Sequence, residues 1–328
     1  MTAVRPQSAG KAIERTDVVS VLSLISVSFR YASGPFWARR HVDAVRGVNL
    51  EIAEGQTVGL VGESGSGKTT LGRLALGLLH PSRGHALIDG IPQGQEHRSL
   101  RGKSQVVLQN PEWSLNPRLR VETSIAEPLA VLRAGNRTER RARVHSMLDH
   151  LGLESSLASR FPHELSGGQL QRMAIARALI TFPRFVVFDE AVSALDVSVQ
   201  TQILNLIKTT QVDRAFAALF ISHDLAAVRY VADSIAVMYA GEIVELAPSH
   251  RFYARPRHPY GRALQLSIME GNEAFQLKGE PGPIPSTGCP LSPRCPMAIQ
   301  RCRIEKPDLR LVDNELVACH RAEEVGER

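Results

Sequence analysis

Long apolar runs are missing from this 328-residue sequence. A membrane-spanning helix needs roughly 18 or more consecutive apolar residues, whereas the longest apolar stretches here, such as residues 217–221, have the length of a strand. The first twenty residues lack the apolar core of a secretory signal. Dense blocks of lysine and arginine are absent too, although the net charge is +6. These absences predict a cytosolic chain that binds no nucleic acid and reaches a membrane only by docking to a partner.

Cysteine is scarce, and all of it lies near the C-terminus, at Cys289, Cys295, Cys302 and Cys319. Disulfides rarely persist in the cytosol, so this clustering favours metal or redox chemistry. The spacing lacks the tight Cys-x2-Cys pairs of most zinc sites. Four reduced thiols packed in a small tail are the alternative.

The order of patterns along the chain predicts an α/β fold. Residues 21–61 alternate apolar and polar side chains as strands do, a glycine-rich loop follows, and apolar residues at helical spacing then continue to Leu79, ahead of Pro81. Residues 110–181 favour helices, while the apolar runs at 184–190 and 219–222 favour buried parallel strands. We expect a flexible arm at residues 1–20 and a loop-rich tail after about residue 250, where proline becomes frequent.

A phosphate-binding pattern fills the loop after residue 61. It reads Gly62-Glu63-Ser64-Gly65-Ser66-Gly67-Lys68-Thr69, with Thr70 next, and matches the P-loop in full. Its glycines let backbone N–H groups converge on phosphate oxygens, and the following helix directs the positive end of its dipole at the anion. We expect Lys68 to contact the β- and γ-phosphates and Thr69 to bind Mg²⁺.

Two acids end the apolar run at 185–190. Asp189 is the expected Mg²⁺ ligand, directly or through water, and Glu190 is placed to act as general base on an attacking water. Alone, two such acids could merely cap a helix. Because they follow a P-loop by about 120 residues, they indicate nucleotide hydrolysis.

A third motif points to one class of nucleotide hydrolase. Leu165-Ser166-Gly167-Gly168-Gln169, followed by a helical stretch to Leu179, resembles the signature sequence of ABC ATPases. The resemblance implies that residues Ser166, Gly167, Gly168 and Gln169 face the γ-phosphate bound by another subunit, so that hydrolysis needs a head-to-tail dimer. A hydroxyl and N–H groups at a helix N-terminus suit such an anion contact.

The same resemblance implies further roles in chain order. Gln109 touches Mg²⁺ or water and senses the membrane subunit, Asp196 belongs to the D-loop at the dimer interface, and His223 contacts the γ-phosphate. Tyr31 is the expected adenine-stacking residue, with Phe29 as its rival. Every group needed for hydrolysis is present, so an active ATP hydrolase is expected.

Finer features resemble the oligopeptide/dipeptide/nickel importer ATPases. They are residues 61–73, 109–111, 114–118, 162–165 and 194–200 and the triplet His258-Pro259-Tyr260. The family implies the second ATPase of a pair, peripheral on the cytoplasmic face of the inner membrane and using ATP and Mg²⁺. Its implied partners are a paralogous ATPase, two membrane permeases and an extracytoplasmic solute-binding protein. Residues 21–250 would form a P-loop NTPase core with an antiparallel β subdomain and a helical insertion at about 110–181, and residues 251–328 a small irregular C-terminal extension.

Some members of that family hold an iron–sulfur cluster in the extension, and the Cys-Pro pairs at 289–290 and 295–296 favour a [4Fe–4S] cluster over zinc as a structural staple. The cargo expected is a di- or oligopeptide, with nickel, an opine or a sugar as alternatives that use the same chemistry. A soluble ABC ATPase acting on nucleic acid is the alternative from another class. Only the basic charge favours it, and the chain has neither long coiled-coil arms nor a second ATPase cassette.

Overall fold

The computed structural model describes residues 20–33, 40–93, 100–267, 275–280 and 282–325, so the arm expected at residues 1–20 lies outside the described residues except for Ser20. The strands are β1 (Ser20–Ser33), β2 (Arg40–Ala53), β3 (Thr57–Val61), β4 (Arg83–Ile88), β5 (Ile91–Pro92), β6 (Ser104–Leu108), β7 (Phe185–Asp189), β8 (Ala217–Ile221), β9 (Ser234–Tyr239), β10 (Glu242–Pro248), β11 (Arg310–Val312) and β12 (Glu315–Val317). The α-helices are α1 (Lys68–Ala75), α2 (Val121–Val131), α3 (Arg137–His150), α4 (Gly167–Leu179), α5 (Val197–Arg214), α6 (Leu225–Val231), α7 (Ser249–Ala254), α8 (Pro259–Leu266), α9 (Gln300–Ile304) and α10 (Ala322–Val325). Short 3-10 helices are η2 (Pro111–Ser114), η3 (Ser155–Ser159) and η4 (Pro162–Glu164).

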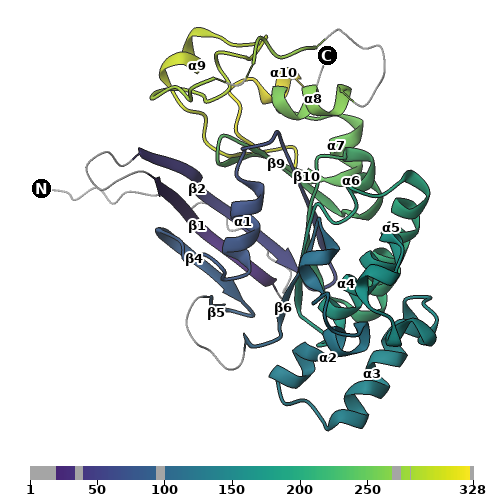
Figure 1. Cartoon of the computed structure of the whole chain (residues 1–328). Coiled ribbons are helices and arrows are strands. Elements are labelled where there is room, and N and C mark those ends of the chain that lie inside the picture. Colours follow the sequence, from purple (N-terminus) through teal and green to yellow (C-terminus); the bar gives the residue numbers. More distant parts are fainter. Residues whose placement is uncertain (1–19, 34–39, 94–99, 268–274, 281, 326–328) are drawn as a thin grey trace, which may run out of the picture.

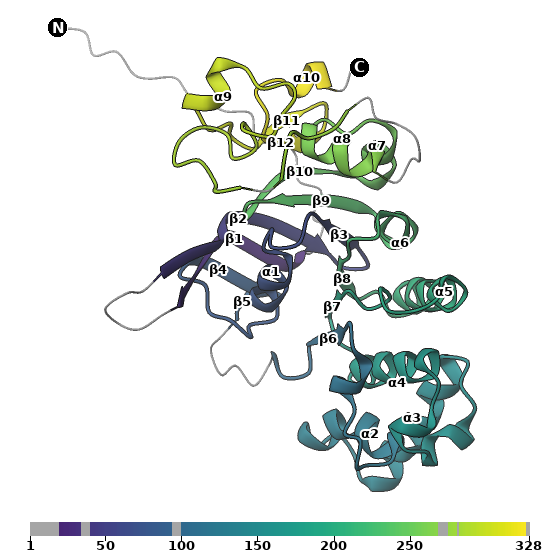
Figure 2. The same cartoon turned by 45° about the horizontal axis from the view of Figure 1, so that its top comes forward.

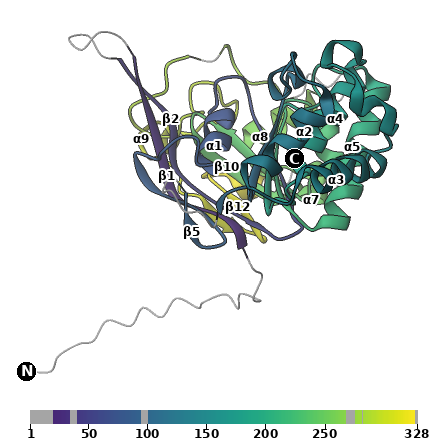
Figure 3. The same cartoon turned by 60° about the horizontal axis from the view of Figure 1, so that its bottom comes forward.

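Two sheets organise the chain (Figure 1). The larger sheet has the order β11-β12-β10-β9-β3-β8-β7-β6, and its strands β9, β3, β8, β7 and β6 run parallel. The smaller sheet, β2-β1-β4-β5, is antiparallel. Helix α1 contacts strands of both sheets, and Figure 3 shows the antiparallel sheet on one side of the molecule and α2 to α5 on the other. The predicted α/β fold with an antiparallel β subdomain and a helical insertion is confirmed.

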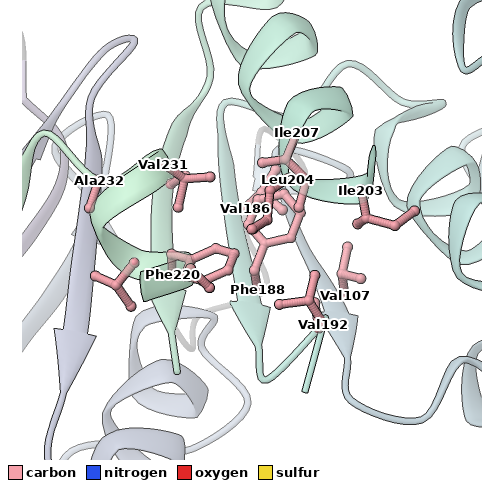
Figure 4. Close-up of a cluster of buried hydrophobic side chains, with 14 of the residues drawn as sticks. Val107, Val186, Phe188, Val192, Ile203, Leu204, Ile207, Phe220, Val231 and Ala232 are labelled. Atoms are coloured by element: carbon pink, nitrogen blue, oxygen red, sulfur yellow. The ribbon is translucent and has the colours of Figure 1, made fainter. Parts of the chain in front are cut away.

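The central parallel strands are buried on both faces, which explains their unbroken apolar runs. In β7, Phe185 and Val187 pack into a cluster with α1 and the antiparallel sheet, whereas Val186 and Phe188 pack into a second cluster with α4, α5 and α6. Figure 4 shows part of the second cluster, with side chains of α5 directed at Phe188. Because alternate side chains of β7 pack into two different cores, the strand is held on both faces. Asp189, the last residue of β7, is thereby held in a fixed position at the edge of the sheet.

The expected helix after the glycine loop is shorter than predicted. It ends at Ala75, although Leu78 and Leu79 continue the apolar spacing. The chain turns at Gly77, whose φ is +71°, and this conformation ends the helix. Leu78 is consequently 65% exposed.

The C-terminal residues differ in part from the expected loops. Residues 275–280 and 282–299 contain no helix or strand, as predicted. Strand β12, however, pairs antiparallel with β10 and thereby joins the larger sheet. The extension is therefore built onto the main sheet. Within the described ranges, no helix is long and apolar enough to cross a membrane.

Candidate functional site

The loop between β3 and α1 has the shape of an anion cradle. Gly62, Gly65 and Gly67 have φ values of +153°, +80° and +108°, which residues with a side chain rarely adopt. A Cβ at Gly62 would lie 2.2 Å from the carbonyl oxygen of Met238, and one at Gly67 would lie 2.3 Å from that of Ala44. The loop packs so closely against β9 and β2 that only glycine fits at these two positions.

Lys68 is the first residue of α1, and its side chain turns back into the loop. Its Nζ donates to the carbonyl oxygens of Gly62 at 2.7 Å and Glu63 at 2.9 Å. Lys68 is 7% exposed; burial lowers the pKa of its ammonium, and the charges of Glu190, Asp189 and Glu63 oppose that shift. Phosphate oxygens could replace the loop carbonyls as acceptors for this desolvated cation.

Two kinds of hydrogen-bond donor in the same loop lack a partner among the described residues: the first N–H groups of α1 and the hydroxyl of Ser66. Helix α1 begins without a side-chain cap, so its first N–H groups point out of the helix without a capping oxygen. The buried Oγ of Ser66 has no hydrogen-bond partner among the described residues. Buried hydroxyls are nearly always hydrogen-bonded, so this orphan hydroxyl beside uncapped N–H groups fits a ligand with several oxygens, such as a phosphate.

Asp189 ends β7 beside the start of α1. The hydroxyl of Thr69 donates to its Oδ1 at 3.3 Å, although the two residues are 120 positions apart. Burial raises the pKa of Asp189, the hydrogen bond from Thr69 lowers it, and the nearby charge of Glu190 raises it. A hydroxyl next to a partly desolvated carboxylate is a donor set that suits a hard divalent cation such as Mg²⁺.

Glu190 and His223 meet at the same edge of the sheet. His223 Nδ1 lies 3.3 Å from Glu190 Oε1, and the two side chains are 62% and 27% exposed. Glu190 has φ +51°, an uncommon conformation for a residue with a side chain, and its N–H donates to the carbonyl of Ile221 at 2.9 Å. Strained backbone of this kind concentrates at functional sites. The pair is open to a water molecule from solvent.

Gln109 and Tyr31 are the remaining predicted residues of this site. Leu108, the last residue of β6, pairs with Asp189, so the exposed Gln109 is the first residue after the paired part of β6. Tyr31 is 38% exposed, and its hydroxyl lies 3.4 Å from Thr70 Oγ1. Phe29 packs edge-on against the Tyr31 ring and against the core. Of the two aromatic candidates, Tyr31 is therefore the one beside α1.

Residues 165–169 form a separate surface. Ser166 caps α4: its Oγ accepts from the N–H of Gln169 at 3.3 Å, and Gln169 Oε1 accepts from the N–H of Ser166 at 3.0 Å. Ser166 and Gly167 are exposed. Helix α4 lies with α2 and α3, away from α1 (Figures 1 and 2). The fold thus does not bring this motif to the P-loop of the same chain.

Asp196 caps α5 at a nearby surface. Its Oδ1 accepts from the N–H of Val199 at 3.0 Å and from the hydroxyl of Ser198 at 2.8 Å, and these hydrogen bonds lower the pKa of its carboxyl. The next residue, Val197, is 79% exposed.

Two C-terminal residues contact the glycine loop and were not predicted as site residues. The guanidinium of Arg294 donates to both carboxylate oxygens of Glu63, at 2.9 and 3.0 Å. The hydroxyl of Tyr260 accepts from the N–H of Glu63 at 2.5 Å. These contacts join positions 231 and 197 residues apart. Tyr260 belongs to the triplet noted in the sequence, but that triplet carried no signal of a contact with the loop.

The four cysteines line one pocket together with His258 and His320. All are free thiols, and burial raises the pKa of Cys289 to about 11 and that of Cys319 to about 12. The predicted iron–sulfur cluster is nevertheless not supported by this arrangement, because no three His, Cys, Asp or Glu side chains of the described residues are placed to hold a metal ion. Free cysteines can pack like small apolar side chains without a metal.

Comparison with known proteins supports the resemblances. A family model described as "ABC transporter" matches residues 45–193, and one described as "Oligopeptide/dipeptide transporter, C-terminal region" matches residues 244–302. A putative peptide import ATP-binding protein of Brucella abortus (strain 2308) is 47% identical over 87% of this chain and 89% of its own length. The di/tripeptide transport ATP-binding protein DppF of Pseudomonas aeruginosa (strain UCBPP-PA14) is 43% identical over 90% of this chain and 95% of its own length.

Solved structures agree on the fold. A dimeric post-hydrolysis state of the ATP-binding cassette MJ0796, bound to ADP and Pi, matches with a TM-score of 0.62 at 30% identity, over 70% of this chain and 98% of that one. The cbiO1 protein of Clostridium perfringens, part of the ABC transporter complex cbiONQ, matches with a TM-score of 0.63 at 26% identity, over 76% and 96% of the two chains. The chain belongs to the ATP-binding proteins of ABC transporters, as the sequence motifs predicted.

Proposed function

We propose that this chain is the ATP-hydrolysing subunit of an ABC importer for di- or oligopeptides. The observation that supports this best is the meeting of the Thr69–Asp189 and Glu190–His223 pairs at one sheet edge, in a chain that also matches the oligopeptide/dipeptide C-terminal region. The cargo class rests on that region and on relatives named for peptide transport, such as those from Brucella and Pseudomonas.

In the proposed binding mode, residues 62–70 enclose the triphosphate. Backbone N–H groups and the unpartnered hydroxyl of Ser66 donate to phosphate oxygens, and Lys68 exchanges its two loop carbonyls for the β- and γ-phosphates. The half-exposed ring of Tyr31, next to Thr70, stacks on adenine.

The hydrolytic step uses the second half of the site. Thr69 and Asp189 are the proposed Mg²⁺ ligands, with Gln109 contacting the ion or its water, and Mg²⁺ neutralises phosphate charge when bound. Glu190 accepts a proton from the attacking water, whose oxygen bonds to the γ-phosphorus while the bond to the β–γ bridging oxygen breaks. His223 contacts the γ-phosphate and orients Glu190 from 3.3 Å away.

One chain supplies only part of each site in this proposal. Ser166 and Gly167 are exposed on a surface away from α1, so a paralogous ATPase would complete the site in a head-to-tail heterodimer, with Asp196 at the interface. The dimeric MJ0796 cassette bound to ADP and Pi is a precedent among structural relatives. We expect Ser166→Arg to keep ATP bound at this chain's own P-loop and to reduce hydrolysis at the partner's P-loop in the assembled transporter.

The remaining partners follow from the importer assignment: two membrane permeases, on whose cytoplasmic side the chain docks, and an external solute-binding protein. Reconstitution of the whole complex in proteoliposomes tests the cargo. We expect ATP-dependent accumulation of di- and oligopeptides, with hydrolysis stimulated by the peptide-loaded binding protein. Accumulation of nickel or a sugar in place of peptides would refute the cargo while leaving the hydrolytic site intact.

The sequence-based prediction of an iron–sulfur cluster has one support, the convergence of four cysteines on one pocket. The placement of the described side chains favours four packed thiols instead. Iron and acid-labile sulfide measured on anaerobically purified protein, together with absorbance in the sulfur-to-iron charge-transfer region, decide between the two.

A further inference from the structure

In the described part of the C-terminal extension (residues 251–328), Arg294 and Tyr260 form hydrogen bonds with Glu63 of the glycine loop. Arg294 donates two parallel N–H···O bonds to the Glu63 carboxylate, at 2.9 and 3.0 Å. This two-pronged geometry adds strength and directional specificity to the ion pair, because both carboxylate oxygens and two of the three guanidinium nitrogens are used. The side chain of Arg294 is 11% exposed and that of Glu63 is 31% exposed, so water screens the pair only in part.

Arg294 is itself held in place by its own loop. Its N–H donates to the carbonyl of Leu291 at 2.9 Å, and its carbonyl accepts from the N–H of Lys278 at 2.8 Å. The next residue, Cys295, lines the cysteine pocket. The guanidinium is therefore presented to Glu63 from a fixed backbone, which reduces the entropy lost when the pair forms.

Tyr260 fixes the backbone of Glu63 from the same side. Its side chain is fully buried, its hydroxyl accepts from the Glu63 N–H at 2.5 Å, and its ring lies 4.7 Å from that of Tyr239 at the end of β9. The extension thus holds both the main chain and the side chain at the second position of the P-loop.

The charge of Glu63 acts inside the cradle. Its carbonyl oxygen accepts from Lys68 Nζ, and its carboxylate is one of the charges that act on the Lys68 ammonium. A carboxylate left without a partner beside this cradle would repel a triphosphate. Arg294 removes that repulsion and directs the carboxylate toward the extension.

We propose that Arg294 is a positioning residue for ATP binding, which neutralises Glu63 and holds the start of the P-loop in the shape that accepts the triphosphate. The extension then sets the nucleotide affinity of the ATPase core to which it is attached. This inference rests on the nucleotide site proposed at residues 62–70.

Equilibrium binding of a fluorescent, non-hydrolysable ATP analogue to the full-length chain tests the inference. Arg294→Gln is expected to weaken binding about tenfold, since one partner of a shielded charge pair is removed. The double change Arg294→Gln/Glu63→Gln is expected to regain most of that affinity, because no unpaired carboxylate remains. Arg294→Lys is expected to bind with intermediate affinity, because lysine keeps the positive charge but cannot donate two parallel hydrogen bonds to the carboxylate. In the assembled transporter, KM for ATP should rise by a larger factor than kcat falls.

Arg301→Gln is the matched control. Arg301 also makes a two-pronged pair, with Glu305 in the same extension, but both side chains are more than half exposed at 57% and 53%, so we expect wild-type nucleotide affinity. Thermal unfolding of each variant reports any general loss of fold. Wild-type affinity in Arg294→Gln, or a double variant as weak as Arg294→Gln, would overturn the inference. Unchanged binding in Lys68→Ala would instead refute the nucleotide site itself, so the two failures are distinguishable.

Discussion

A single methyl group at Gly67 provides a sharp test of the loop geometry. In Gly67→Ala the new Cβ would lie 2.3 Å from the carbonyl oxygen of Ala44 and 2.8 Å from Cε of Met238, at a φ of +108°. The backbone strain costs about 1–2 kcal/mol, and relief of the overlap adds about 1–3 kcal/mol because β2 must move away. Even the lower end of this sum, about 2 kcal/mol, lowers affinity roughly 30-fold if it falls on the ATP-accepting shape. Isothermal titration with a non-hydrolysable ATP analogue measures this loss directly.

Gly65→Ala is the control for the collision. Gly65 also has a positive φ, +80°, but a Cβ there would meet no atom within 4 Å. Only the strain remains, about 1 kcal/mol, so affinity should fall about fivefold. Equal losses in the two variants, or no loss in Gly67→Ala, would refute the claim that close packing of the loop on β2 shapes the site.

Three further changes test other parts of the account. Burial raises the pKa of Glu245 from 4.5 to about 8, so the unfolded chain releases this proton near pH 4.5 and the folded chain near pH 8. The stability that the protonated carboxyl contributes is therefore fully present below pH 4.5 and is lost as the pH rises through 8; between these two pKa values the free energy of unfolding falls by about 1.4 kcal/mol per pH unit. Glu245→Gln should remove this slope from unfolding free energies measured in urea, and an unchanged slope would contradict the assignment. Gly261→Ala places a Cβ 2.3 Å from Glu245 Oε2 and should lower the unfolding free energy by about 1–3 kcal/mol, whereas an unshifted urea midpoint would exclude the close contact. Thr69→Val removes the hydroxyl that contacts Asp189 and should raise the Mg²⁺ concentration for half-maximal hydrolysis at least about tenfold; an unaltered Mg²⁺ dependence would show that this hydroxyl is no ligand.

The parts of the site that lie within one strand–loop–helix unit could be predicted from the sequence. Glycines at 62, 65 and 67 followed by Lys68 carry a local signal, because the phosphate loop is built from consecutive backbone groups. Asp189 was found the same way, since a buried strand of five residues ends at a fixed sheet edge. The meeting of Thr69 with Asp189 then follows because β3 and β7 both run parallel to β8, one on each side of it, and so end at the same edge of the sheet.

The contacts that sequence reasoning missed are all distant in the chain. Arg294 meets Glu63 across 231 positions, from a loop without periodicity. Strand β12 has three residues, too few for an alternation pattern, and its place in the sheet depends on β10. The early end of α1 was missed because Leu78 and Leu79 kept the helical spacing past Gly77, whose φ of +71° ends the helix. Tertiary packing decided the first two of these features, and the local conformation of Gly77 decided the third.

Glu190→Gln tests the central claim, that this chain hydrolyses ATP at the site formed by β3, α1 and β7. The substitution keeps the side-chain shape beside His223 but removes the proton acceptor, so turnover should fall by about 10²- to 10⁴-fold. Single-turnover hydrolysis in the reconstituted transporter measures it, with the partner ATPase's own base replaced in both preparations so that only this chain's site reports. The account predicts that ATP stays bound and unhydrolysed in Glu190→Gln, and turnover near that of the unsubstituted chain would contradict it.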